Sequence, residues 1–142
     1  MIDIMCKTFT MHKRHLLYLF FIIYRYLKIK ENPDIPSHRV IYIVSGRAAP
    51  NNQSGKELIH FVLDLQNFIN NDPIAHLHMK ILYVPNYCVS VAEFLIPAAD
   101  SSQHISAPGT EPSGTSNMKC IMNGGLIVGS RDGSNLEIER EL

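Results

Sequence analysis

The segment from Gly109 to Lys119, GTEPSGTSNMK, has the residue types of an anion-binding loop followed by a reactive amine. Small residues such as Gly114 let backbone N–H groups approach an anion, and a helix that starts behind them adds a favourable dipole. Lys119 lies about one helical turn beyond Thr115 and Ser116, so its amine could reach a group bound there. This combination suits a phosphate-bearing cofactor whose carbonyl forms an imine with a lysine. Taken alone, it also suits a surface turn with a solvated lysine.

The remaining composition excludes several kinds of site. Thirteen basic residues balance thirteen acidic ones, so no net charge draws the chain to nucleic acid or to an acidic membrane. A local basic site remains open at Lys7, Lys13 and Arg14. The three cysteines are far apart and form no C-x-x-C, which argues against a disulfide framework or zinc and favours the cytoplasm. The histidines at 60, 76 and 78 lack a matching ligand set for a metal.

An apolar run at residues 16–24 follows Lys13 and Arg14, as in a signal peptide. It is shorter than the roughly 20 apolar residues that span a bilayer, and no small-residue cleavage site follows. We therefore expect no membrane association and predict a helix over residues 12–30 that is buried on most sides.

The hydrophobic pattern predicts an α/β fold with a parallel sheet. Predicted strands cover residues 39–44, 80–85 and 126–129, and predicted helices cover 12–30, 57–70, 89–95, 117–122 and a last charged segment after residue 134. Residues 101–116 are predicted to be a loop. We expect Ile41–Val44 and Ile81–Val84 to be neighbouring central strands, parallel and joined by a right-handed crossover.

Several motifs occur in one order along the second half of the chain. These are NYCVSVAE from Asn86, IPAAD from Ile96, GTEPSGTSNMK from Gly109, MNGG from Met122 and DGSNLE from Asp132. GRAAP at Gly46 and NDP at Asn71 precede them. The chain resembles the α-1,4-glucan phosphorylases of glycogen, starch and maltodextrin. The likeness is strong over residues 80–139 and thin before residue 38.

The resemblance implies that the chain binds pyridoxal 5′-phosphate. Lys119 would form the Schiff base, Tyr87 would lie against the cofactor, and its phosphate would be held by Gly114, Thr115, Ser116 and Lys7. The cofactor's phosphate would assist proton transfer.

The resemblance also implies the substrates. An α-1,4-glucan would be cleaved by orthophosphate to glucose 1-phosphate, with Lys13 holding the orthophosphate. Glu111, Ser113 and Gly114 would bind hydroxyls of the transferred glucose. Members of the family are typically homodimers.

Departures from the family pattern fall near the phosphate sites. Thr8 stands where the family has an arginine that binds phosphate, Thr10 replaces a histidine and His12 a tyrosine. Loss of a charge-assisted hydrogen bond, worth about 1.5–3 kcal/mol, could slow the reaction about ten- to a hundredfold. Pro112 replaces an alanine, and Cys88 replaces a basic residue.

The resemblance gives the expected domain organisation. Residues 1–142 would form one incomplete domain: a weakly matched N-terminal helical part over 1–37, then a βαβ core with the cofactor loop over 38–142. This would be part of a Rossmann-like half of a GT-B glycosyltransferase. We expect such a fragment to be inactive alone. The alternatives are a non-catalytic module that binds the cofactor or associates with a phosphorylase, the product of a truncated gene, and a short membrane-attached protein.

Overall fold

The computed structural model describes residues 1–34, 38–111 and 114–141, and it contains one five-stranded sheet. The strand order is β3-β2-β1-β4-β5 and all neighbouring pairs are parallel. The strands are β1 (Ile2–Cys6), β2 (Val40–Ser45), β3 (Met79–Val84), β4 (Ser101–His104) and β5 (Leu126–Gly129). The predicted α/β class with a parallel, partly Rossmann-like sheet is therefore confirmed.

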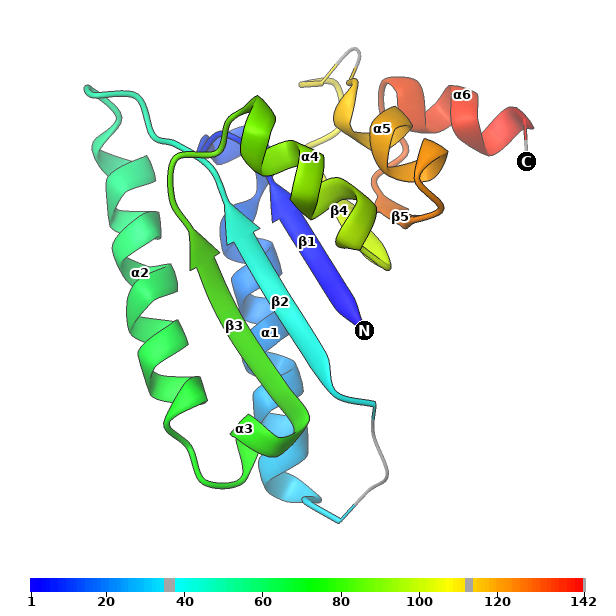
Figure 1. The fold of residues 1–142 in the computed structure, drawn as a ribbon. Coiled ribbons are helices and arrows are strands. Elements are labelled where there is room, and N and C mark those ends of the chain that lie inside the picture. Colours follow the sequence, from blue (N-terminus) through cyan, green and yellow to red (C-terminus); the bar gives the residue numbers. More distant parts are fainter. Residues whose placement is uncertain (35–37, 112–113, 142) are drawn as a thin grey trace.

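Helices cover both faces of this sheet (Figure 1). The helices α1, α2 and α3 pack in one apolar cluster, whereas α4 and α5 pack in a second cluster. Their bounds are α1 (His15–Glu31), α2 (Gln53–Asn70), α3 (Ala75–His78), α4 (Val89–Ala98), α5 (Ser116–Met122) and α6 (Ser134–Glu141), with a 3-10 turn η1 (Met11–Lys13) before α1.

Strand β1 joins the two clusters because successive side chains of a strand point to opposite faces. Met5 packs with the α1 and α2 side chains, and its neighbour Ile4 packs with Ile96 of α4. Both β1 side chains are almost completely buried. A strand buried on both faces is typical of parallel sheets covered by helices.

A buried carboxylate connects β1 to two other elements. Asp3 accepts hydrogen bonds from Ser101 Oγ (2.7 Å) and from Gln103 Nε2 (3.0 Å), both on β4. The hydroxyl of Tyr18, on α1, donates to it at 3.0 Å. Burial raises the pKa of Asp3, and these three hydrogen bonds oppose the increase. The polar side chains of β4 are thus used inside the protein, where each has a partner.

The predicted pairing of Ile41–Val44 with Ile81–Val84 is confirmed, because β2 and β3 are parallel neighbours in that register. The prediction that both are central is wrong, since β3 lies at the edge and β1 is in the middle. β1 was not predicted, and β4 lies inside the predicted loop over 101–116. Its residues, SSQH, have no apolar pattern; hydrogen bonding rather than hydrophobicity makes them a strand.

The predicted burial of α1 on most sides is wrong. Tyr18, Leu19 and Ile22 face the core and are buried. A helix that packs on one sheet buries only the stripe that faces it. The outer apolar side chains are 43–56% exposed: Leu16, Leu17, Phe20, Phe21, Tyr24 and Leu27.

Several helix boundaries differ from the prediction. α1 starts at His15, after a 3-10 turn, rather than at residue 12. α2 starts at Gln53 rather than at 57, because the Asn52 side chain caps it by accepting from Gly55 N at 2.9 Å. α4 continues through Pro97 to Ala98, so the predicted end before that proline is wrong.

We predict that His15 makes stability depend on pH. Its ring stacks on Phe9 (centroids 4.3 Å apart), and burial lowers its pKa from 6.5 to about 4. The unfolded chain therefore takes up this proton at a higher pH than the folded one. The contribution of neutral His15 to the free energy of unfolding is complete above pH 6.5. It is lost as the pH falls towards 4, at up to about 1.4 kcal/mol per pH unit.

In the variant His15→Phe, unfolding should take up one proton fewer, so the free energy of unfolding should depend less steeply on pH. The slope is measured by urea unfolding at several pH values between 4 and 7. His60→Gln, on an exposed part of α2, is the control and should keep the wild-type slope. Equal slopes for wild type and His15→Phe would contradict the assignment.

Candidate functional site

The predicted site residues gather at the carboxyl edge of the sheet. Lys7 directly follows β1, Arg47 lies just beyond β2, and Tyr87 follows β3. Lys119 comes from α5, which follows β4 in the chain. Ligands of open parallel α/β sheets bind at this edge, outside the strand ends.

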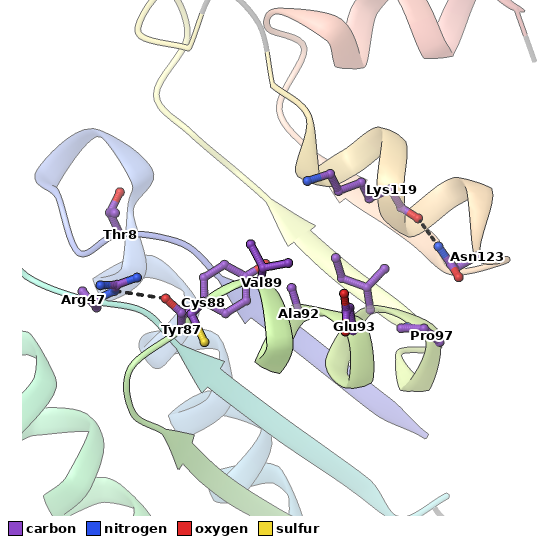
Figure 2. Close-up of a pocket in the computed structure, with 11 residues that line it drawn as sticks. Thr8, Arg47, Tyr87, Cys88, Val89, Ala92, Glu93, Pro97, Lys119 and Asn123 are labelled. Atoms are coloured by element: carbon purple, nitrogen blue, oxygen red, sulfur yellow. Dashed lines mark hydrogen bonds between the residues drawn. The ribbon is translucent and has the colours of Figure 1, made fainter.

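A pocket of about 830 Å³ contains Lys119 and Tyr87 (Figure 2). Thr8 and Arg47 lie on one side of it and Lys119 on the other, with its amine pointing towards the side of Thr8. The main chain at Lys119 is held on α5, where its carbonyl oxygen accepts from Asn123 Nδ2 at 2.8 Å. The amine forms no ion pair with any of the described residues, which leaves it available to a ligand.

The floor of this pocket is mostly apolar. Val89, Ala92, Ile96 and Pro97 of α4 line it beside the ring of Tyr87. Burial, and after it the two cysteines 6 and 120, raise the pKa of Tyr87 to about 12, so its hydroxyl is protonated at neutral pH. An apolar wall with few polar groups suits a flat aromatic ligand. The residues present therefore fit the ring of pyridoxal phosphate.

Lys7 does not line this pocket but lines two small cavities, one of which shares Tyr87 with the pocket. One of about 10 Å³ is lined by Lys7, Tyr87 and Ser116. The other, of about 20 Å³, is lined by Lys7, Gly114 and Glu111. Lys7 thus lies between the Tyr87 side of the site and the loop that precedes α5.

Charges of both signs lie around these cavities: Lys7 lines both, and Glu111 and Asp132 line the larger one. Burial lowers the pKa of Lys7, and the charge of Lys13 lowers it further, while Glu111 opposes the shift. Burial also lowers the pKa of His104 to about 3, with Lys7 and Lys13 contributing. His104 is therefore neutral, and its Nδ1 lies 3.5 Å from Ser116 Oγ. The charged form of Lys7, which is disfavoured in this way, would be stabilised by a nearby anion.

Lys13 and Glu111 form an ion pair, with 3.0 Å between Nζ and Oε2. His12 Nε2 lies 3.7 Å from the same carboxylate oxygen. Burial by itself would raise the pKa of Glu111, but the hydrogen bond and charge of Lys13 lower it overall. The resemblance assigned Lys13 to orthophosphate and Glu111 to glucose, whereas the structure has the two side chains bound to each other.

The start of α5 is fixed to α6 by a buried amide. Asn117 Nδ2 donates to Ser134 Oγ and to Asn135 Oδ1, both at 2.7 Å. Thr115 is the N-cap residue of α5, and its side chain makes no capping hydrogen bond. Its hydroxyl is therefore not used by the helix. Ser113, a predicted glucose ligand, lies outside the described residues.

Sequence reasoning missed three residues that the structure brings to the site: Arg47, His104 and Asn123. Arg47 lies two residues after β2, level with Thr8 after β1, and only the pairing of these two strands brings it to the site. His104 lies in the predicted loop over 101–116, which gave no reason to expect it to be buried.

The described residues contain no group of three or more His, Cys, Asp or Glu side chains that could hold a metal ion. No helix among them is both long and apolar enough to cross a membrane.

The fold and site are those of a parallel α/β protein with a lysine-bearing pocket at the sheet edge. Comparison with known proteins extends this. The family described as carbohydrate phosphorylase matches residues 1–142. Glycogen phosphorylase 2 of Dictyostelium discoideum is 48% identical over 136 residues, which are 96% of this chain and 14% of that protein.

Two further relatives match nearly the whole chain. Glycogen phosphorylase of Haemophilus influenzae is 43% identical over 96% of this chain and 17% of its own length. The α-glucan phosphorylase H isozyme of Solanum tuberosum is 42% identical over 99% of this chain and 17% of its own length. The chain belongs to the carbohydrate phosphorylase family, and it spans 14–17% of the length of these relatives.

We predict that Glu111→Gln lowers the pKa of Lys7 further, because the charge of Glu111 opposes the shift in the folded protein. The measurement is NMR titration of the lysine amines after reductive methylation with ¹³C-formaldehyde. Glu139→Gln is the control, since Glu139 pairs with Arg131 at 2.9 Å on the exposed surface. An unchanged Lys7 titration in Glu111→Gln would show that this carboxylate does not balance its charge.

Proposed function

We propose that this chain carries the cofactor-binding part of an α-1,4-glucan phosphorylase. The observation that supports this best is the position of Lys119, whose amine enters an apolar pocket next to Tyr87. Lys7 and the loop before α5 lie beside it. Relatives that carry phosphorylase names are 42–48% identical to this chain over 96–99% of its length.

In this proposal Lys119 holds pyridoxal phosphate covalently, and Tyr87 packs against its ring. Gly114, Thr115, Ser116 and Lys7 bind its phosphate, which suits a half-buried lysine whose pKa is lowered. When bound, the cofactor supplies a phosphate that acts as an acid–base group beside the substrate.

The substrates in this proposal are an α-1,4-glucan and orthophosphate. Lys13 binds orthophosphate, and Glu111, Ser113 and Gly114 bind hydroxyls of the terminal glucose. The Lys13–Glu111 ion pair at 3.0 Å must open so that each side chain can meet its own substrate. The product is glucose 1-phosphate. Three free cysteines, Cys6, Cys88 and Cys120, support a reducing, cytoplasmic location.

The first test is chemical trapping of the cofactor. The chain is incubated with pyridoxal phosphate, reduced with borohydride and mapped by peptide analysis. We expect most of the label on Lys119, because this amine faces the pocket. Lys119→Arg should lose that label while keeping the charge. Lys56→Arg, which changes an exposed lysine of α2, should retain it. Label spread evenly over the lysines would refute the proposal.

We also predict that the 142-residue chain alone does not release glucose 1-phosphate from glycogen, starch or maltodextrin at a detectable rate. Holding reactants together can contribute about 7–11 kcal/mol to catalysis, and the pocket around Lys119 is open to solvent. The assay includes pyridoxal phosphate and a Lys119→Ala control. Release that disappears in that control would contradict the prediction.

A further inference from the structure

We propose that Arg47 is a ligand for a phosphate-class oxyanion in the Lys119 pocket, with the hydroxyl of Thr8 beside it. The inference deepens the proposed function and depends on it for the identity of the anion, which is either orthophosphate or the phosphate ester of pyridoxal phosphate. Both have the same chemistry at a guanidinium group.

The position of Arg47 is fixed at its main chain. Its carbonyl oxygen accepts from Phe9 N at 2.9 Å, and the preceding residue, Gly46, lies directly against the chain that follows β1. A Cβ atom added at Gly46 would collide with the carbonyl oxygen of Lys7. The β1 and β2 ends are therefore in close contact, which keeps Arg47 next to Thr8.

The side chain is fixed as well, at the inner end of its guanidinium. Arg47 Nε donates to the carbonyl oxygen of Tyr87 at 3.0 Å (Figure 2). This bond uses one of the five N–H donors and leaves the terminal nitrogens for another partner. A guanidinium oriented in this way can bind an oxyanion through two parallel hydrogen bonds.

The charge of Arg47 is not balanced by an ion pair. Ion pairs among the described residues involve Lys13, Lys28, Lys30, Arg131 and His12, but neither Arg47 nor Lys119. Both cations line the same pocket, whose single lining carboxylate is Glu93. A pocket with two cations and one carboxylate carries a net positive charge, which attracts an anion.

Thr8 explains why a positive charge would be needed from another strand. Thr8 stands where the resemblance places a phosphate-binding arginine, and its short side chain brings no positive charge. Arg47 reaches the same side of the pocket from the end of the neighbouring strand (Figure 2). The guanidinium would thus be supplied by β2 instead of β1.

The test measures anion binding by the whole chain and four variants. Arg47→Gln removes the charge, and Arg47→Lys retains it without the paired donors. Arg39→Gln is the matched control, because Arg39 lies at the opposite end of β2 and also donates to a main-chain carbonyl, that of His76. The double variant Arg47→Gln with Thr8→Arg tests whether a guanidinium from β1 restores binding. Circular dichroism confirms that each variant is folded.

Three ligands separate the two sources of the anion. Pyridoxal phosphate and pyridoxal are titrated by absorbance, and their difference reports on the ester phosphate. Orthophosphate is titrated by calorimetry into chain that already carries borohydride-reduced cofactor. We expect Arg47→Gln to weaken binding of the ester phosphate or of orthophosphate about ten- to a hundredfold. The affinity for pyridoxal should not change, and Arg39→Gln should bind all three ligands like the wild type. The phosphate affinity of Arg47→Lys should lie between those of the wild type and Arg47→Gln. The double variant should regain the phosphate affinity of the wild type.

Equal affinities of wild type and Arg47→Gln for both phosphates would overturn the inference. Trapping on Lys119 tests the proposed function separately. If Lys119 is labelled and the Arg47 variants bind normally, only this inference fails. If binding of pyridoxal phosphate needs Arg47 but Lys119 is not labelled, the anion site stands and the proposed function fails.

Discussion

The rest of the arrangement depends on the burial of one carboxylate, Asp3, in the middle of the sheet. It receives hydrogen bonds from Tyr18, Ser101 and Gln103 and so joins α1, β1 and β4. An unpaired buried carboxylate would be costly, whereas one with three donors tolerates burial. Because β1 leads directly to Lys7, and β4 leads towards the loop before α5, this contact also connects the elements that carry the candidate site.

The hydrophobic pattern predicted the strands whose buried side chains are apolar, and it failed for the strand whose buried side chains are polar. β2 and β3 have β-branched, apolar residues and were predicted with their parallel pairing. β4 is made of Ser, Ser, Gln and His, and such residues enter a sheet only when partners distant in sequence satisfy them. β1 is short, and Asp3 interrupts its apolar pattern. β3 lies at the edge because the two strands that were not predicted, β1 and β4, lie on the other side of β2.

The site was predictable to the extent that it lies in one continuous segment. The motif from Gly109 to Lys119 indicated the lysine and the phosphate loop, and the structure brings Lys119 and Tyr87 into one pocket. Arg47 and the Lys13–Glu111 pair could not be predicted, because each depends on contacts between segments that only the fold brings together. The proximity of these residues results from the fold at the sheet edge, and their roles are what the experiments test.

The central position of β1 has a consequence for synthesis of the chain. Ser101 and Asp3 are 98 positions apart, so β1 leaves the ribosome long before β4 exists. At 5–20 residues per second, this interval lasts about 5–20 s. Throughout it, the β4-facing edge of a strongly apolar strand has no partner and offers unpaired backbone groups to other chains. The central strand of this sheet is therefore paired on both sides only after translation has supplied β4.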